Sequence, residues 1–261
     1  MLPLSDAMWS APFYWPMRDA LALTEHGAGM AIVASPIQWL GGSPLLAYNV
    51  LLIGCAWWSA LAAHALVRRL TGSHAAAFCA GIAYGFAPYR ASQLAHMHLL
   101  AAWWMPLALL ALHAFYQDGR RRWLALFGVS WLLQSLTNGY YMFFFPVLLA
   151  AWVAFFTPWR ERPRRAIAVA VTWILFSLPL LPVLWKYYTV QHALNLGRTR
   201  GEMMLFSAKW SSFLNPAPLL RFWPERQVHT QEDYMFPGVF VIALVATGGI
   251  VAWRRKSAAG H

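Results

Sequence analysis

The sequence predicts an all-α fold: a polytopic transmembrane helical bundle of about seven spans, with one further helix at the outer membrane surface. Three observations predict this fold. Hydrophobic residues make up 60% of the 261 residues and charged residues only 11%, whereas a soluble domain has about 25% charged residues. Apolar runs of roughly membrane-spanning length follow one another along the chain. Most cations stand in clusters at the ends of alternate runs.

Seven apolar runs are expected to form the spans. A bilayer core needs roughly 20 apolar residues of helix, and tilt or local thinning widens that range. Thr137-Asn138-Gly139 is a turn signal between two runs, and Pro179 and Pro182 interrupt the sixth. Backbone groups freed by such breaks must be buried in protein or line a wet cavity. The predicted spans are Pro44–Val67, His74–Pro88, Leu99–Tyr116, Trp123–Leu136, Tyr140–Phe156, Ala166–Tyr188 and Pro237–Trp253.

Four cationic clusters determine the expected orientation of the bundle. They hold twelve of the 20 Lys and Arg residues. Cytoplasmic loops carry an excess of Lys and Arg, and only seven spans with an outer N-terminus put all four clusters inside. Membrane topology thereby accounts for most of the net charge of +11. Basic patches can bind the phosphate backbones of nucleic acids, but here the cations are already explained, so we expect no nucleic acid partner. The clusters are Arg68–Arg69, Arg120–Arg122, Arg160–Arg165 and Arg254–Lys256.

This topology divides the chain into four segments. Residues 1–43 form an outer segment in which Gly27–Leu40, apolar but short and containing Pro36, is expected to be an interfacial or re-entrant helix. A true span there is the lesser alternative. Residues 44–188 form a six-span transmembrane core, residues 189–236 an outer (periplasmic) loop, and residues 237–261 the last span and a cytoplasmic tail. Chemistry is expected on the outer side, because the outer segments hold most of the acids.

The outer segment contains a candidate catalytic group just before the Gly27 helix. Asp19 and Glu25 are its carboxylates, and His26 follows Glu25 directly. A carboxylate beside an imidazole can act as a general base or bind a metal. The alternative from spacing alone is that both acids cap or solvate an interfacial helix.

A second group lies between the second and third spans. Arg90 stands at the outer boundary, where an arginine can clamp a phosphate by paired hydrogen bonds or can simply snorkel to the interface. His96 and His98 are two residues apart and would diverge by about 200° on a regular helix. We therefore do not expect them to chelate one metal there.

Two further groups complete the candidate substrate-binding residues. Asn138, Tyr140 and Tyr141 surround a turn at membrane depth, where tyrosines also serve as interfacial anchors. Arg200 and Glu202 lie in the long outer loop. Charged loop residues are usually only solvated, but loops longer than about 15 residues are often functional.

Many short motifs resemble those of bacterial membrane glycosyltransferases of the C-type (GT-C) fold. The matches cover nearly the whole chain and are more specific for the family than for a substrate. They are Phe13-Tyr14-Trp15-Pro16, Leu21 to His26, Pro36, Ala47-Tyr48-Asn49, Arg69 to Ser73, Ala87 to Arg90, Gln93 to His96, Trp103 to Leu107, Gly139-Tyr140-Tyr141, Arg200, Glu202, Ser207-Ala208 and Glu232 to Gly238.

The resemblance implies a multi-pass enzyme of the bacterial cytoplasmic (inner) membrane that works in cell-envelope synthesis. It would transfer a hexosyl or pentosyl group from a polyprenyl-phosphate donor, within membrane lipid, to an acceptor at the outer face. An outer carboxylate, Asp19 or Glu25, would be the base. Arg90, helped by His96 or His98, would stabilise the departing phosphate. The resemblance implies no particular cofactor, and a divalent metal is an open alternative.

The sequence also departs from the family pattern. Members carry the acid near the end of a first span and continue beyond the last span seen here, so we expect an incomplete member that lacks the first transmembrane helix and the C-terminal part. Two other functions stay open: a transporter or flippase for lipid-linked sugars, and a non-catalytic membrane subunit of envelope glycan assembly. Transporters often bury ionisable groups near mid-membrane. The predicted mid-span regions are nearly free of them, which favours surface chemistry.

Overall fold

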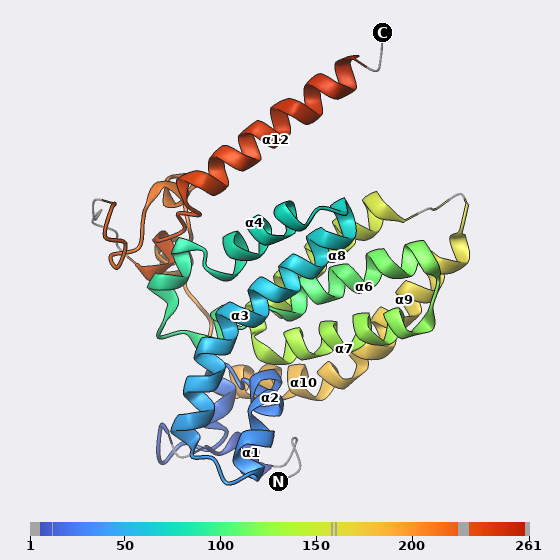
Figure 1. Cartoon of the computed structure of the whole chain (residues 1–261). Coiled ribbons are helices and arrows are strands. Elements are labelled where there is room, and N and C mark those ends of the chain that lie inside the picture. Colours follow the sequence, from blue (N-terminus) through green and yellow to red (C-terminus); the bar gives the residue numbers. More distant parts are fainter. Residues whose placement is uncertain (1–5, 12, 158, 160, 224–229, 259–261) are drawn as a thin grey trace. The chain divides into compact units, whose positions relative to one another are not determined.

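Figure 1 shows a computed structural model of the chain, in which the described residues form helices and no strand. The structure describes residues 6–11, 13–157, 159, 161–223 and 230–258. The predicted all-α class is confirmed. The chain divides into two compact units. The first unit comprises Met1–Gly85 and His96–Gly197, and the second comprises Phe86–Ala95 and Arg198–His261.

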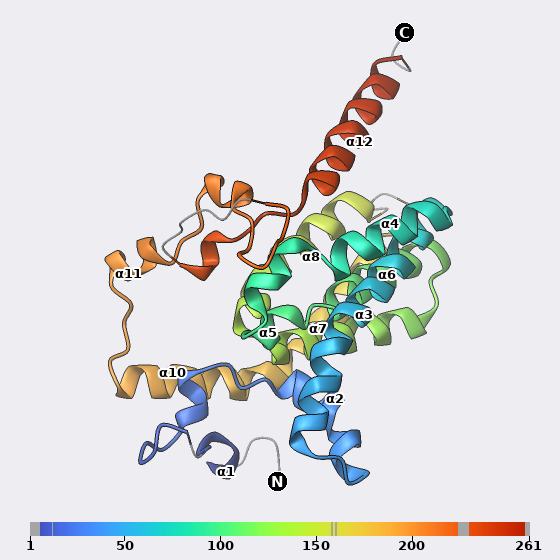
Figure 2. The same ribbon diagram turned by 60° about the vertical axis from the view of Figure 1, so that its left-hand side comes forward.

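The first unit is a helical bundle with its core around α6. This helix contacts α3, α7, α8 and α9, and Leu112, Phe127 and Leu149 are fully buried in the shared core. Figure 1 shows α3, α6 and α7 running side by side, and Figure 2 shows α1 beside α10. The helices are α1 (Asp6–Trp9), η1 (Ala20–Leu23), α2 (Ala28–Trp39), α3 (Pro44–Thr71), α4 (His74–Gly85), α5 (Met97–Leu100), α6 (Trp104–Asp118), α7 (Arg121–Thr137), α8 (Gly139–Phe156), α9 (Pro163–Ser177), η3 (Leu178–Leu180) and α10 (Leu181–Ala193).

Among the described residues, four helical segments are long and apolar enough to cross a membrane. They are Pro44–Thr71, Met97–Asp118, Gly139–Phe156 and Pro163–Ala193. These segments coincide with the first, third, fifth and sixth predicted spans. The other three predicted spans fall on α4, α7 and the apolar part of α12, which are shorter. The range Gly27–Leu40 is also helical, since α2 covers most of it and contains Pro36.

The third predicted span is broken between α5 and α6. Residues 101–103 leave the helical path there, and a membrane offers no water to satisfy the freed carbonyl groups. Side chains from three neighbouring helices take that role, so this break, which the sequence did not predict, is buried in protein. The hydrogen bonds run from Tyr84 to the Ala102 carbonyl (3.0 Å), from Gln134 to the Ala101 carbonyl (2.9 Å) and from Tyr141 to the Leu99 carbonyl.

Two arginines of the third cationic cluster close the C-terminal end of α6. Arg165 donates to the carbonyl oxygens of Phe115 and Tyr116, and Arg162 donates to that of Tyr116 at 3.3 Å. The last carbonyls of a helix lack partners within it and carry partial negative charge, so a guanidinium there is stabilising. Gly119 completes the end in the left-handed conformation, with φ of 72°. These cations are therefore part of the packing as well as of the charge pattern.

Helices α3 and α4 approach each other closely through glycine. Gly81 and Gly85 lie four residues apart on α4. A Cβ at position 85 would lie 2.6 Å from the carbonyl oxygen of Ala56 and 2.6 Å from the Cβ of Ala60 on α3, and one at position 81 would lie 2.8 Å from the Ala60 carbonyl oxygen. Small residues at this spacing let helix backbones pack tightly where lipid removes the hydrophobic drive for association.

The second unit is built from short helices and one long helix. It contains η2 (Pro88–Gln93), α11 (Arg200–Leu205), η4 (Trp210–Leu214), η5 (Gln231–Asp233) and α12 (Val239–Ala258). Within it, Gly238 packs close to Pro88, and its φ of 99° favours glycine.

Candidate functional site

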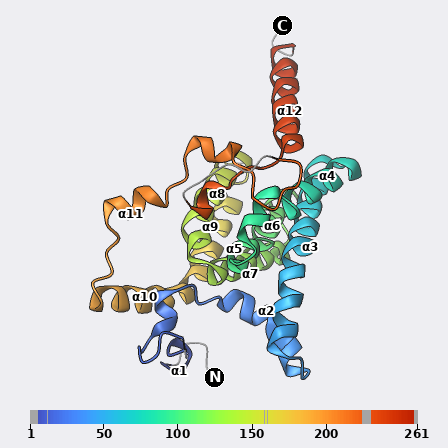
Figure 3. The same ribbon diagram turned by 90° about the vertical axis from the view of Figure 1, so that its left-hand side faces the viewer.

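The predicted catalytic residues of the outer segment pack against two helices that follow far later in the chain. Helix α2 brings them there. Gly29 lies so close to Leu133 and Thr137 of α7 that a Cβ at position 29 would clash with both. Figure 3 shows α2 next to the start of α3. The loop Thr24 to Gly27 just before α2 is thereby held near the junction of α7 and α8.

Glu25 binds the first turn of α8. Its Oε2 accepts a hydrogen bond from the backbone N–H of Gly139 at 2.7 Å, where the positive end of the helix dipole favours a carboxylate. A Cβ at position 139 would lie 3.3 Å from Oε1, so glycine leaves room for the acid. Burial raises the pKa of Glu25 above its usual value, and the Gly139 hydrogen bond only partly offsets that effect. Oε1 accepts no hydrogen bond from the described residues.

Asn138 organises the same turn. It is fully buried in an extended conformation, and its Oδ1 caps α8 by accepting from the Tyr140 N–H at 2.6 Å. Its side-chain Nδ2 is buried without a partner among the described residues. Asn138 therefore combines a capping role with one unused donor.

His26 is fixed by Tyr187 of α10. The Tyr187 hydroxyl donates to the Thr24 carbonyl oxygen at 2.8 Å and accepts from the His26 backbone N–H at 3.2 Å. Its third contact is to His26 Nδ1 at 3.1 Å. Because the hydroxyl has one proton, we assign the ring proton to Nδ1, which leaves a lone pair on Nε2. Nε2 is buried without a partner among the described residues.

Asp19 has a different environment from Glu25. Its Oδ1 lies 2.7 Å from Nζ of Lys186 on α10, and its backbone is in the left-handed region with φ of 58°. An acid committed to an ion pair is a weaker candidate for a base than one with an unbonded oxygen. Of the two carboxylates predicted as catalytic, the structure therefore favours Glu25.

The remaining predicted residues are spread over both units. Arg90 is buried in η2. Tyr140 is half-exposed at the start of α8, and Tyr141 binds the α5 carbonyl described above. Arg200 begins α11, and Glu202 forms a capping box with Thr199, accepting its N–H at 2.8 Å. That hydrogen bonding lowers the pKa of Glu202 and gives it a local structural role.

His96 and His98 lie closer together than a regular helix would place them. Their ring centroids are 5.7 Å apart, edge to face. The expected divergence does not occur because His96 precedes α5 with a non-helical backbone, φ −113° and ψ 64°. Among the described residues no group of three His, Cys, Asp or Glu side chains could hold a metal ion.

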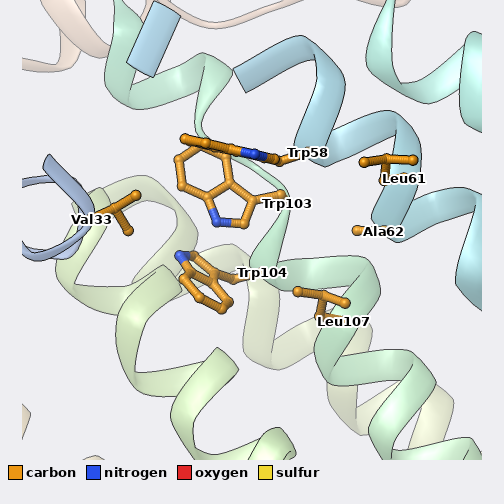
Figure 4. Close-up of a pocket in the computed structure, with 7 residues that line it drawn as sticks. All are labelled: Val33, Trp58, Leu61, Ala62, Trp103, Trp104 and Leu107. Atoms are coloured by element: carbon orange, nitrogen blue, oxygen red, sulfur yellow. The ribbon is translucent and has the colours of Figure 1, made fainter. Parts of the chain in front are cut away.

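An apolar pocket of about 390 Å³ opens between α2, α3 and α6. Figure 4 shows three indole rings, those of Trp58, Trp103 and Trp104, gathered between Val33 on one side and Leu61, Ala62 and Leu107 on the other. The Trp58 and Trp103 rings meet edge to face with centroids 5.1 Å apart. Trp104 Nε1 is buried without a hydrogen-bond partner among the described residues. The pocket therefore offers an apolar, aromatic wall.

A family model for a domain of unknown function, DUF6311, matches residues 29–261. The chain belongs to the DUF6311 family. No curated protein and no solved structure matched the chain. The matched range begins just after Glu25 and His26. It contains their partners, Gly139 of α8 and Tyr187 of α10.

Sequence reasoning missed the residues of this DUF6311 chain that hold the outer segment in place. Tyr187 and Trp9 received no role, although Trp9 packs edge to face on Tyr187 with ring centroids 5.7 Å apart. For Gly139 the sequence indicates only a turn and a short family motif, not a partner for Glu25. The hydrogen bond between Tyr187 and Thr24 joins residues 163 positions apart, and Trp9 lies further still from Tyr187 in the sequence, so no local sequence pattern predicts these pairings.

His26 of the DUF6311 chain is expected to make stability fall as the pH drops below neutral. Burial lowers the pKa of His26 to about 4 from the usual 6.5. At a pH between these two values, the unfolded state binds a proton at His26 and the folded state does not. The expected loss is about 1 kcal/mol at about pH 5.5. Thermal unfolding of the detergent-solubilised protein would measure it.

The His26→Gln variant is the control for this prediction, since it cannot titrate. Its stability should change less between neutral pH and about pH 5.5. The raised pKa of Glu25 acts in the opposite direction in both proteins, so the difference between them isolates His26. Equal pH dependence in both proteins would contradict the assignment.

Proposed function

We propose that the chain is a multi-pass glycosyltransferase of the bacterial cytoplasmic membrane, with seven spans and a GT-C-like fold. It transfers a sugar from a polyprenyl-phosphate donor to an acceptor hydroxyl at the outer face. The observation that carries the proposal is the state of Glu25: a half-buried carboxylate on a helix N-terminus, with a raised pKa and one oxygen that accepts no hydrogen bond from the described residues.

In the proposed reaction Glu25 acts as the general base. The acceptor oxygen attacks the anomeric carbon and forms the new C–O bond, its proton passes to Oε1 of Glu25, and the bond from the anomeric carbon to the phosphate oxygen breaks. The leaving group is polyprenyl phosphate, which keeps the bonding electrons. A partly desolvated carboxylate suits this step because its pKa is moved toward that of a base poised near neutral pH.

Neighbouring groups support the positioning of a sugar hydroxyl. Neutral His26 offers the Nε2 lone pair as an acceptor, and Asn138 offers Nδ2 as a donor. Buried polar groups without partners are costly and often mark a place where a ligand completes the hydrogen bonds.

The Trp-lined pocket supports a lipid-linked donor. Its wall is apolar and it opens among helices α3 and α6, both within membrane-capable segments. Hydrocarbon chains need such a surface.

A lipid-linked sugar transfer assay on membranes containing the full chain tests the proposal. The expected result is consumption of a polyprenyl-phosphate sugar with release of polyprenyl phosphate. If a panel of such donors is left intact by folded protein, the proposal fails. Counterflow of the same lipid-linked sugars in liposomes without transfer would identify the transport alternative instead.

Arg90 has its own prediction. Arg90→Ala is expected to lower transfer about 100-fold, because it removes the cation that the family resemblance assigns to the departing phosphate. Arg90 is buried, so Arg90→Lys, which keeps the charge, separates charge loss from packing loss and should retain part of the activity. Transfer rates and unfolding temperatures should be measured together. A near-wild-type rate in folded Arg90→Ala would remove Arg90 from the mechanism.

A further inference from the structure

The segment 198–223 of the second unit presents large apolar side chains to the outside although it is not a membrane-capable helix. Trp210 is 91% exposed and Phe222 is 88% exposed. Side chains this apolar are costly to leave in water, so several of them exposed within one short segment indicate an interaction site. Others in the same segment are Met204, Leu205, Phe213 and Leu219.

This exposure results from a defined local fold. Ser212 is fully buried, and its hydroxyl donates to Asp233 at 2.8 Å. The Met235 N–H donates to the Ser212 carbonyl oxygen at 3.1 Å, and the Phe236 N–H donates to that of Asn215 at 3.3 Å. The segment is thus tied to residues 233–236 within its own unit, with its apolar side chains on the outside.

The same segment carries charge of mainly one sign. Its only acid, Glu202, is engaged by Thr199 in the capping box of α11. Its cations alternate with the apolar residues along the chain, and all of them are exposed. They are Arg198, Arg200, Lys209 and Arg221.

Covalent connection places a bilayer within reach of the segment. The membrane-capable segment Pro163–Ala193 ends shortly before Arg198, and the apolar helix Val239–Arg254 follows. A surface tethered next to its target binds at high effective concentration, so modest contacts are sufficient.

We infer that segment 198–223 binds the surface of a bilayer that contains anionic lipids, with Trp210 and Phe222 in the interfacial region and the four cations at lipid phosphates. Trp prefers this region, and each basic residue near an anionic surface adds about 1 kcal/mol. A protein partner fits less well, because cations interleaved with apolar residues would have to be buried and paired in its interface. The inference does not depend on the proposed enzymatic function.

Site-directed spin labelling of the full chain in nanodiscs tests the inference. In a Cys55→Ala, Cys79→Ala background, labels are placed by Trp210→Cys or Phe222→Cys. Collision with oxygen, which partitions into lipid, is compared with collision with a water-soluble nickel reagent. Gly197→Cys serves as the matched control, because Gly197 is exposed just outside the segment and a Cβ there meets nothing within 4 Å.

The expected result is an oxygen-to-nickel accessibility ratio several times higher at positions 210 and 222 than at 197 in nanodiscs containing phosphatidylglycerol. The ratio should fall in purely zwitterionic nanodiscs and when the four cations are changed to Gln. Access to nickel at both positions would overturn the inference. Protection from both reagents would also overturn it, since a protein surface or a second copy would then cover the segment. If the ratio is the same in zwitterionic nanodiscs and after the Gln changes, the proposed role of anionic lipids is refuted.

Discussion

Replacing Glu25 with glutamine is expected to lower the rate of sugar transfer by about 10²–10⁴-fold while the protein stays folded. Glutamine has nearly the same shape, and its carbonyl oxygen can still accept the Gly139 N–H that now binds Oε2. What the variant loses is the ability to take a proton. The transfer assay on membranes measures the rate, and thermal unfolding in detergent verifies the fold.

Asp19→Asn is the matched control, because it removes the other carboxylate that the sequence predicted as catalytic. Its pair with Lys186 is partly exposed, so its loss should cost at most about 1 kcal/mol of stability and little activity. The acid limb of the wild-type rate profile should follow the raised pKa of Glu25 and disappear in Glu25→Gln. If the Asp19→Asn variant is inactive and the Glu25→Gln variant is active, the general base is Asp19 and not Glu25.

Gly85→Leu is expected to separate α4 from α3 and to destabilise the first unit by about 3 kcal/mol or more. The new side chain would meet the carbonyl oxygen of Ala56 and the backbone of Ala60, and neither can rotate away. The buried Cys55 thiol of α3 provides the readout. In a Cys79→Ala background, a thiol-reactive dye should label Cys55 at a much lower temperature in the variant.

Gly248→Leu is the comparison that separates close packing from the loss of a helical glycine. Gly248 also lies within a helix, but a Cβ there meets nothing within 4 Å. Leucine is the better helix former, so this change should be neutral or slightly stabilising. Equal unfolding temperatures for the two variants would show that Gly85 does not determine the approach of α3 and α4.

The positions of the helices could be predicted from the sequence because lengths of apolar runs and their breakers are local signals. The predicted span Tyr140–Phe156 differs from α8 by one residue, and the break at Pro179 appears as η3 between α9 and α10. The close glycine contact could also have been found, since Gly81 and Gly85 stand four residues apart in an apolar run.

The candidate site could be predicted only as a set of separate residues. Glu25, His26 and Asn138 were singled out by their types and by the outer position of their segments. Their partners, Gly139 for Glu25 and Tyr187 for His26, depend on tertiary packing between elements more than 100 residues apart. The edge-to-face contact of His96 and His98 could not be predicted from helical spacing, because the backbone at His96 is not helical.

The contact of Arg162 and Arg165 with the end of α6 affects how topology experiments on this chain should be read. Deleting basic residues is a usual way to reverse the insertion of a membrane protein. Here such a deletion would also release the terminal carbonyls of a neighbouring helix. If the deletion gave an inverted or degraded protein, the cause would be either the lost charge bias or the misassembly of the helices. Lysine at both positions keeps the charge but not the forked donor geometry, and so distinguishes the two causes.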